Sequence, residues 1–266
     1  MSKRVALITG AYGAIGKAIA HGIAKRQDHE IVLAGRNKEA LENVVAALRE
    51  STTNPDIRAV MVDLSSQYSI DALQEKWQGP LHIMINNAAT TPVQRQLNAD
   101  GIEMQWATNV LGYFWMMHYM SKFMKDVDDA RIVNVASYWA GGLDLNDVEF
   151  AHRTYDNDAA YRQSKQADRM LSIAFADLLI PFGITVNACH PGDVNSKLSN
   201  SLGFGGHESP KQGAETPVWL ATAPDVKGIY GKYFEHAHQT TCRFSNNKEE
   251  IESLYNQCLT YSVITK

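Results

Sequence analysis

The feature that most constrains this chain is a repeated alternation of short, continuously apolar runs with longer runs of helical period. The apolar runs predict buried strands near 5–8, 31–34, 57–62, 81–85, 131–135 and 184–188. The segments between them predict helices near 14–26, 38–50, 66–77, 100–126 and 159–180. Strands without polar alternation are covered on both faces, which is typical of a parallel sheet between helices. The pattern therefore predicts an α/β fold with a doubly wound parallel sheet, in one domain over 1–266.

Composition limits the class of partner. The 25 Lys and Arg residues against 29 Asp and Glu give a net charge of -4, so the chain has no overall attraction to nucleic acid. The three cysteines form no CxxC pair and predict neither a zinc ribbon nor a disulfide framework. The sequence has neither a signal peptide nor the ~20-residue apolar stretch of a membrane anchor, so we expect a cytoplasmic protein.

A glycine-rich segment joins the first predicted strand to the first predicted helix. Its glycines let the backbone turn tightly and approach a pyrophosphate, and the helix start offers free N–H donors. In this strand-turn-helix context the segment predicts a dinucleotide site of Rossmann type rather than a simple tight turn. The candidate contacts are Gly10, Tyr12, Gly13, Ala14, Ile15 and Gly16.

The end of the second strand predicts which dinucleotide binds. A carboxylate there would bind the ribose of NAD, whereas an arginine would accept the 2′-phosphate of NADP. The sequence has Arg36 followed by Asn37, a plausible helix N-cap, and Glu30 stands at the opposite end of the strand. We therefore expect NADP(H). The alternative is that Arg36 only lies in solvent at the helix start.

A tyrosine and a lysine four residues apart are the candidate proton-transfer groups. This spacing places Tyr161 and Lys165 on one helical face. A phenol has a pKa near 10, so we expect a neighbouring cation to lower it by ~2–3 units. Ser137 closes a strand and is placed to donate a hydrogen bond to a carbonyl. The alternative for Lys165 is a structural ion pair.

Together with five further motifs, these residues resemble the short-chain dehydrogenase/reductase family. The motifs are Asp63-Leu64, Asn86-Asn87-Ala88-Ala89, Asn109, Pro191-Gly192 and the glycine-rich segment Thr9–Gly16. The resemblance implies that Tyr161 donates or accepts the proton, that Lys165 holds the nicotinamide ribose, and that Ser137 orients the carbonyl.

The resemblance also assigns the remaining site residues. Asn109 would support a proton relay through Lys165. Asp63 and Leu64 would lie at the adenine. The rest of the cofactor would contact Asn87, Ala88, Pro191, Gly192 and Val194.

Two long loops, 138–158 and 193–210, follow predicted strands, so we expect them at the carboxyl edge of the sheet, where such folds bind ligands. The long gap from Ser137 to Tyr161 and the segment 209–234 are similar to the retinol dehydrogenase group, which also contains WW-domain oxidoreductases and light-dependent protochlorophyllide reductase. This similarity implies a bulky, apolar carbonyl or alcohol as substrate, and we expect Trp139, Phe204 and Met116 to line its pocket. It also implies a homodimer through the helices near 100–126 and 159–180, unless the loop at 138–158 obstructs that surface.

Several features leave alternatives open. Gly13 gives the loop a TGxxGxxG spacing that is familiar from epimerases and dehydratases that retain their nicotinamide. A cofactor-sensing interaction protein on the same fold is a second alternative. The run 113–120 is expected in the core rather than in a pocket. His236, His238 and Cys242 are not expected to bind a metal, and the acidic stretch Asp144, Asp147, Glu149 is expected to face solvent.

Overall fold

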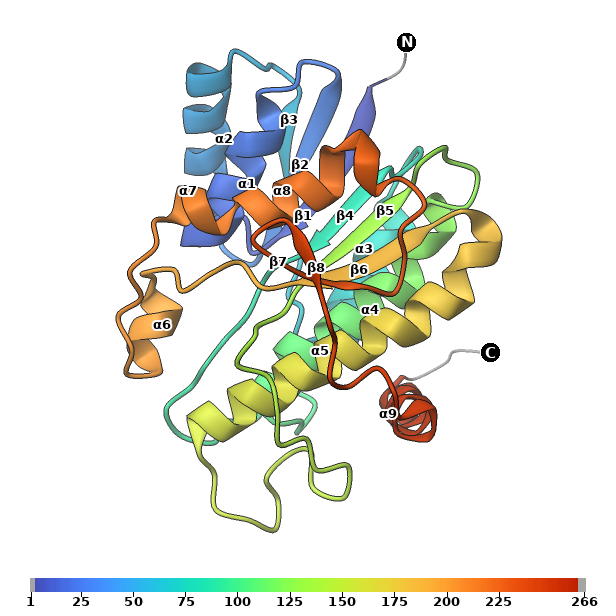
Figure 1. Ribbon diagram of the computed structural model, residues 1–266. Coiled ribbons are helices and arrows are strands. Elements are labelled where there is room, and N and C mark those ends of the chain that lie inside the picture. Colours follow the sequence, from blue (N-terminus) through green and yellow to red (C-terminus); the bar gives the residue numbers. More distant parts are fainter. Residues whose placement is uncertain (1–2, 263–266) are drawn as a thin grey trace.

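The computed structural model describes residues 3–262, which form a sheet between two layers of helices (Figure 1). The strand order is β3-β2-β1-β4-β5-β6-β7-β8, and each neighbouring pair is parallel except the β7–β8 hairpin. The strands are β1 (Arg4–Thr9), β2 (His29–Gly35), β3 (Ile57–Met61), β4 (Ile83–Asn86), β5 (Arg131–Val135), β6 (Thr185–Cys189), β7 (Tyr233–Glu235) and β8 (His238–Thr240). The predicted doubly wound parallel sheet is confirmed, and β7 and β8 extend it beyond the predicted strands.

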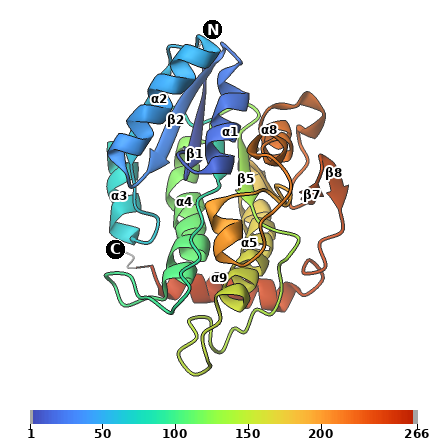
Figure 2. The same cartoon turned by 90° about the vertical axis from the view of Figure 1, so that its left-hand side faces the viewer.

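The helices divide between the two faces of the sheet (Figure 2). One face carries α1 (Ala14–Ala24), α2 (Lys38–Thr52) and α8 (Glu215–Thr222), and the other carries α3 (Gln67–Lys76), α4 (Gly112–Met120) and α5 (Asn157–Leu179). The remaining helices are α6 (Lys197–Ser201), α7 (Pro210–Gly213) and α9 (Lys248–Thr260). Alternate strand residues supply the two cores: Leu7 belongs to the cluster under α4 and α5, and Ile8 to the cluster under α1 and α8.

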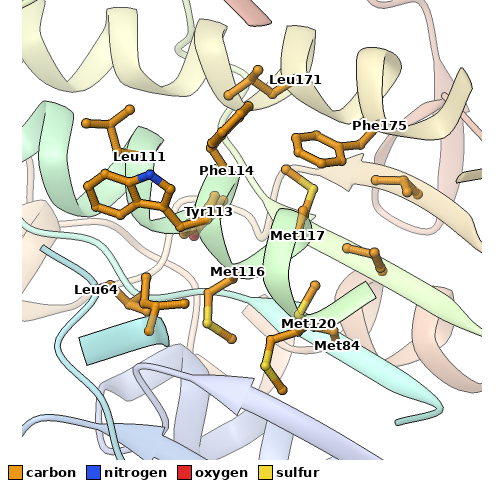
Figure 3. Close-up of a cluster of buried hydrophobic side chains, with 14 of the residues drawn as sticks. Leu64, Met84, Leu111, Tyr113, Phe114, Met116, Met117, Met120, Leu171 and Phe175 are labelled. Atoms are coloured by element: carbon orange, nitrogen blue, oxygen red, sulfur yellow. The ribbon is translucent and has the colours of Figure 1, made fainter. Parts of the chain in front are cut away.

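The helix predicted near 100–126 is divided into three parts. A π-helical turn, η1 (Trp106–Leu111), precedes α4, and a 3₁₀ turn, η2 (Ser121–Phe123), follows it. Almost every residue of α4 is buried, which confirms the run 113–120 as core. Met116 lies inside the cluster shown in Figure 3, together with Leu64 and Met120. The expectation that Met116 lines a substrate pocket is therefore wrong, because α4 is enclosed on nearly all sides.

Two asparagines join neighbouring strands inside the sheet. Asn86 of β4 and Asn134 of β5 are register partners, and the Asn86 Nδ2 donates to Asn134 Oδ1 at 2.8 Å. The Asn134 Nδ2 donates in turn to Ser172 Oγ of α5, also at 2.8 Å. All three side chains are buried, so these bonds tie the strands to the helix that carries the candidate catalytic pair.

The C-terminal helix α9 lies across α4 and α5 (Figure 2). The Tyr255 ring lies 5.3 Å from the ring of Phe114 and 5.5 Å from that of Phe175. Leu254 is fully buried beneath it. The apolar outer face of α4 and α5 is therefore covered by the chain itself.

The long loop at 138–158 is tied to the rest of the molecule by its acidic residues. Glu149 accepts hydrogen bonds from the Glu103 backbone N–H at 2.8 Å and from the Tyr261 hydroxyl at 2.7 Å. Asp147 accepts from the Ala151 backbone N–H at 2.6 Å. The expectation of a solvated acidic surface is wrong for these two residues, because each carboxylate accepts from a backbone N–H: Asp147 from the loop itself, and Glu149 from Glu103 in the segment before η1.

Candidate active site

A groove of about 540 Å³ opens at the carboxyl ends of the first four strands. Such a volume lies in the range of small-molecule sites, and this edge is where doubly wound sheets bind ligands. Most of the predicted cofactor residues line it: Gly10, Tyr12, Gly13, Ala14, Ile15, Gly16, Arg36, Asp63, Leu64, Asn87 and Ala88.

The glycine-rich loop leaves space for a pyrophosphate because side chains are excluded from it. A Cβ on Gly10 would lie 2.7 Å from the Ala88 Cα, and one on Gly16 would lie 2.3 Å from the Gly10 carbonyl oxygen. Gly10 also has a φ of 64°, which favours glycine. Gly13 is the N-cap of α1 and has no side chain that could accept a hydrogen bond. The first N–H groups of the helix therefore stay available at the groove, which Gly13 and Ala14 line. These residues therefore fit a dinucleotide.

The groove wall at the end of β2 is basic and aromatic. A Cβ on Gly35 would lie 2.6 Å from the ring of Tyr12, so that ring packs on the strand end beside Arg36. Arg36 is exposed and, within residues 3–262, forms no ion pair. Asn37 does not line the groove; its Oδ1 accepts from the Ala40 N–H at 3.0 Å, which confirms the predicted N-cap.

Asp63 and Asn87 order the two sides of the groove. Asp63 Oδ1 accepts from the Ser65 N–H and Oγ at 3.0 and 2.8 Å, which leaves its second carboxylate oxygen available. The Asn87 Nδ2 donates to the Thr9 carbonyl at 2.9 Å and thereby holds the end of β4 against the glycine-rich loop.

Asn109 lies in the π-helical turn η1. Its Oδ1 accepts from the Thr90 N–H at 2.8 Å, and its Nδ2 donates to the Thr90 carbonyl at 3.1 Å and to Ser164 Oγ at 3.2 Å. The side chain thus clamps the groove segment at Thr90 against α5. Such π-turns are frequent at functional sites.

Ser137, Tyr161 and Lys165 come together at the carboxyl end of β5, just beyond the groove. Ser137 and Tyr161 are both buried. The Tyr161 phenol and the Ser137 hydroxyl form a hydrogen bond that lowers the pKa of Tyr161, but burial outweighs it and raises that pKa above the ordinary value of a tyrosine. The expectation of a lowered phenol pKa therefore does not describe this structure, because burial first, and then the negative charges of Asp168 and Asp158, favour the neutral phenol.

The amine of Lys165 forms hydrogen bonds with Asp168 and with the end of β5. Its Nζ donates to Asp168 Oδ2 at 2.8 Å and to the Val135 carbonyl at 3.0 Å, and it lies 5.9 Å from the centre of the Tyr161 ring. The pair is fully buried. The lysine therefore shares the site with Tyr161 and at the same time forms the ion pair named as its alternative.

The loop after β6 folds back over the groove. The Asp193 carbonyl accepts from the N–H groups of His207 and Glu208, and Val194 pairs with Glu208 in an isolated bridge. Pro191, Gly192 and Val194, all predicted to contact the cofactor, lie in or beside this stem and outside the groove lining. At its tip, α6 adds Ser196, Lys197, Leu198 and Ser201 to the wall.

A hydroxyl contact holds α6 closed. Ser201 Oγ lies 2.5 Å from Thr91 Oγ1, and the Ser201 carbonyl accepts from the Asn157 Nδ2 at 3.2 Å. Behind this contact the rings of Trp139 and Phe204 meet edge to face, with centroids 4.6 Å apart. The two predicted aromatic residues of the substrate loops are therefore neighbours.

Sequence reasoning missed several residues at this site. Gln96, Thr108 and Lys197 line the groove, and Asp168 pairs with the candidate lysine. The fold-back of 193–208 brings Lys197 to the groove lining, and no local motif predicts that fold-back. Asp168 stands three residues after Lys165, and that spacing alone could have indicated an ion pair.

No group of three or more His, Cys, Asp or Glu in the described part of the chain is arranged to hold a metal; His238 is exposed in β8 and Cys242 is buried. Over residues 3–262, none of the helices combines the length and apolarity needed to cross a bilayer.

Comparison with known proteins identifies relatives. The family model described as short chain dehydrogenase matches residues 4–203. Retinol dehydrogenase 13 of Mus musculus is 32% identical over 93% of this chain and 80% of its own length. A probable oxidoreductase of Streptomyces antibioticus is 33% identical over 88% and 85%, and polyprenol dehydrogenase of Homo sapiens is 28% identical over 99% and 83%.

Solved structures share the fold. An uncharacterized protein from Mycobacterium paratuberculosis superposes with a TM-score of 0.82, at 22% identity over 97% of this chain and 93% of that one. L-Sorbose reductase from Gluconobacter frateurii, solved with NADPH and L-sorbose, gives 0.71, at 23% identity over 88% and 95%. The family match and the relatives above 30% identity show that this chain belongs to the short-chain dehydrogenase family, in its retinol dehydrogenase-like group, whose members are oxidoreductases acting on alcohols and carbonyls with a nicotinamide cofactor.

Proposed function

We propose that this protein is an NADP(H)-dependent oxidoreductase that interconverts a bulky, apolar carbonyl compound and its alcohol, with Tyr161 as the general acid and base. The observation that supports it most is the convergence of Ser137, Tyr161 and Lys165 at the end of β5, next to a groove that fits a dinucleotide. When bound, the cofactor supplies or accepts the hydride.

The residues of the chain divide the remaining work. Because burial raises the pKa of Tyr161, its phenol holds a proton at neutral pH and is ready to donate it to a carbonyl oxygen. Ser137 orients that oxygen through its hydroxyl, which is itself fixed by the Trp139 N–H at 3.0 Å. In the oxidative direction the phenolate must form first, so alkaline conditions favour Tyr161 as the base.

Two further features support the finer parts of the proposal. The Arg36 guanidinium in the groove wall is free to accept a 2′-phosphate, whereas Glu30, the carboxylate of β2, pairs with Arg58 at 2.7 Å at the other end of the strand. The Trp139–Phe204 contact presents apolar surface beside Ser137, which favours an apolar substrate.

The test is a panel of aldehydes, ketones and alcohols assayed with NADPH, NADP⁺, NADH and NAD⁺, on the native chain and on Tyr161→Phe. We expect turnover with the phosphorylated cofactors and a loss of about 10²–10⁴-fold in kcat for the variant, with NADPH binding retained, because only the transferable proton is removed. Tyr138→Phe is the matched control, since the Tyr138 ring is half exposed and outside the catalytic group.

Substantial residual turnover in Tyr161→Phe would contradict the role of Tyr161. NADPH binding without turnover on any substrate would instead indicate a cofactor-sensing interaction protein. Tightly retained NAD(H) that exchanges with neither added cofactor nor substrate would indicate an epimerase or dehydratase.

A further inference from the structure

A buried carboxylate stands behind the candidate catalytic lysine. Asp168 lies three residues after Lys165 on α5, and its Oδ2 accepts from the lysine Nζ at 2.8 Å. The Val135 carbonyl at the end of β5 accepts a second proton of the same amine at 3.0 Å. The side chains are 2% and 0% exposed, so solvent does not screen the interaction.

The pair is not embedded in a closed structural network. Asp168 Oδ1 is buried and has no hydrogen-bond partner among residues 3–262. A buried pair retained only for stability is expected to satisfy both carboxylate oxygens, because an unpaired one costs free energy. The half-satisfied carboxylate therefore points to a role in the site.

The groups around the pair leave its charges as the dominant ones. From the other elements it faces Tyr113 of α4, Cys189 of β6 and Cys258 of α9, and burial raises the pKa of each, so all three are neutral near pH 7. On its own helix it faces Tyr161, beyond which lies Asp158. Burial raises the pKa of Asp168 itself to about 7, against the opposing effect of the Lys165 amine, so this carboxyl is fully ionised only above neutral pH. In that pH range the charge that reaches the phenol is set by the balance of Lys165 and Asp168.

We propose that Asp168 is a positioning residue for the reaction proposed above, on which this inference rests: its carboxylate holds the Lys165 amine at the end of β5 and offsets the positive charge that the amine presents to Tyr161. Without the carboxylate, an isolated amine in this dry site would lack a counter-charge. With it, burial is the main cause that raises the pKa of Tyr161, and the negative charge of Asp168 raises it further, so the phenol stays protonated.

The test removes that charge while keeping the shape. Asp168→Asn and the native chain are labelled with ¹³C at the tyrosine Cζ, and the Tyr161 signal is assigned by its loss in Tyr161→Phe. We expect the native phenol to stay protonated to above pH 10. In Asp168→Asn we expect its titration at least one pH unit lower, a tenfold or greater loss of proton affinity.

Activity gives a second readout. The pH profile of kcat for alcohol oxidation should move to lower pH by the same amount, whereas the KM for the alcohol should change little. Ser172→Ala is the matched control: Ser172 bonds the Asp168 backbone carbonyl at 2.6 Å but carries no charge, so this variant should leave the Tyr161 titration unchanged. Should Asp168→Asn fail to fold, Asp168→Ser removes the charge and leaves room for a water beside Lys165.

An unchanged Tyr161 titration in the charge-free variants would overturn the role of Asp168. The NMR measurement needs no turnover. An inactive native chain would therefore reject the proposed function while the titration still decides the part played by Asp168.

Discussion

Arg36 is the residue on which cofactor preference depends. It is exposed in the groove wall, and its neighbour Lys38 already pairs with Glu42 at 3.7 Å. A guanidinium recognises phosphate through paired, charge-assisted hydrogen bonds, whereas a carboxylate in its place would repel the phosphate and accept bonds from ribose hydroxyls.

We therefore predict that Arg36→Asp inverts the preference between NADPH and NADH in a direct binding titration. NADPH affinity should fall at least tenfold, since charge-assisted bonds contribute about 1.5–3 kcal/mol. Lys38→Asp places the same charge two residues away, outside the groove lining, and should keep the native preference. Equal losses of NADPH affinity in the two variants would show that the added negative charge acts at a distance and that Arg36 does not bind the 2′-phosphate directly.

Single residues also show how far the sequence determines the site. The local motif around Gly10 is sufficient to predict the glycine-rich wall of the groove, because a strand, a turn and a helix that are contiguous in sequence form that wall. The spacing of Tyr161 and Lys165 placed both on one helix but could not predict the direction of the amine. That direction depends on Val135, thirty residues away, and on how completely the helix is buried.

Among the elements, α6 forms part of the groove wall. It has only five residues, and its hydrogen bonds to the facing segments include the Thr91–Ser201 hydroxyl pair and the bond from Asn157. The glycines at 203, 205 and 206 follow it and give the loop little intrinsic stiffness. A few polar contacts therefore determine whether the wall stays closed.

Thr91→Val removes one of these contacts at constant shape. We predict faster proteolytic cleavage of 199–206, by about fivefold, because a hydrogen bond of this kind contributes about 1 kcal/mol to the closed state. Saturating NADPH should restore slow cleavage. Thr90→Val is the control, since Thr90 reaches Asn109 through its backbone only. Identical cleavage rates in both variants would show that the Thr91–Ser201 contact does not hold α6 against the groove.

The elements that the sequence predicted well are those with strong local patterns, such as β5 and α2. Beyond the strand near 184–188, the sequence pattern predicts no strand or helix. The strands β7 and β8 have three residues each, and neither has a recognisable period. The position of β7 comes from pairing with β6, for example Cys189 with Phe234, which is a tertiary contact that a local pattern does not contain, and β8 then pairs with β7.

For the molecule as a whole, α9 decides which surface is exposed. It covers the face of α4 and α5 through which a homodimer was expected. Leu254 and Tyr255 pack on that face and therefore occupy apolar surface that a second chain would otherwise contact. The native chain is thus predicted to be a monomer, as measured by light scattering after size exclusion.

Leu254→Asp tests this arrangement. A charge at a fully buried position should lower the free energy of unfolding by about 3 kcal/mol or more and release α9, so that the uncovered face self-associates with rising concentration. Ser253→Asp introduces the same charge on the exposed side of α9 and should stay within about 0.5 kcal/mol of the native chain. A native dimer that survives Leu254→Asp would place the interface on another surface.

The hydrogen bond between the side-chain amides of Asn86 and Asn134 has a consequence for how this sheet assembles. Parallel strands pair across long stretches of chain, and continuous apolar sequences such as those of β4 and β5 distinguish poorly between correct and slipped alignments. A slip of one residue would turn each amide to the opposite face of the sheet and leave it without a hydrogen-bond partner in the apolar core, at a cost of about 1–3 kcal/mol per group. The two asparagines thereby destabilise misaligned pairings of β4 and β5 during folding. Only the correct alignment lets α5 pack on the sheet with Ser172 bonded to Asn134.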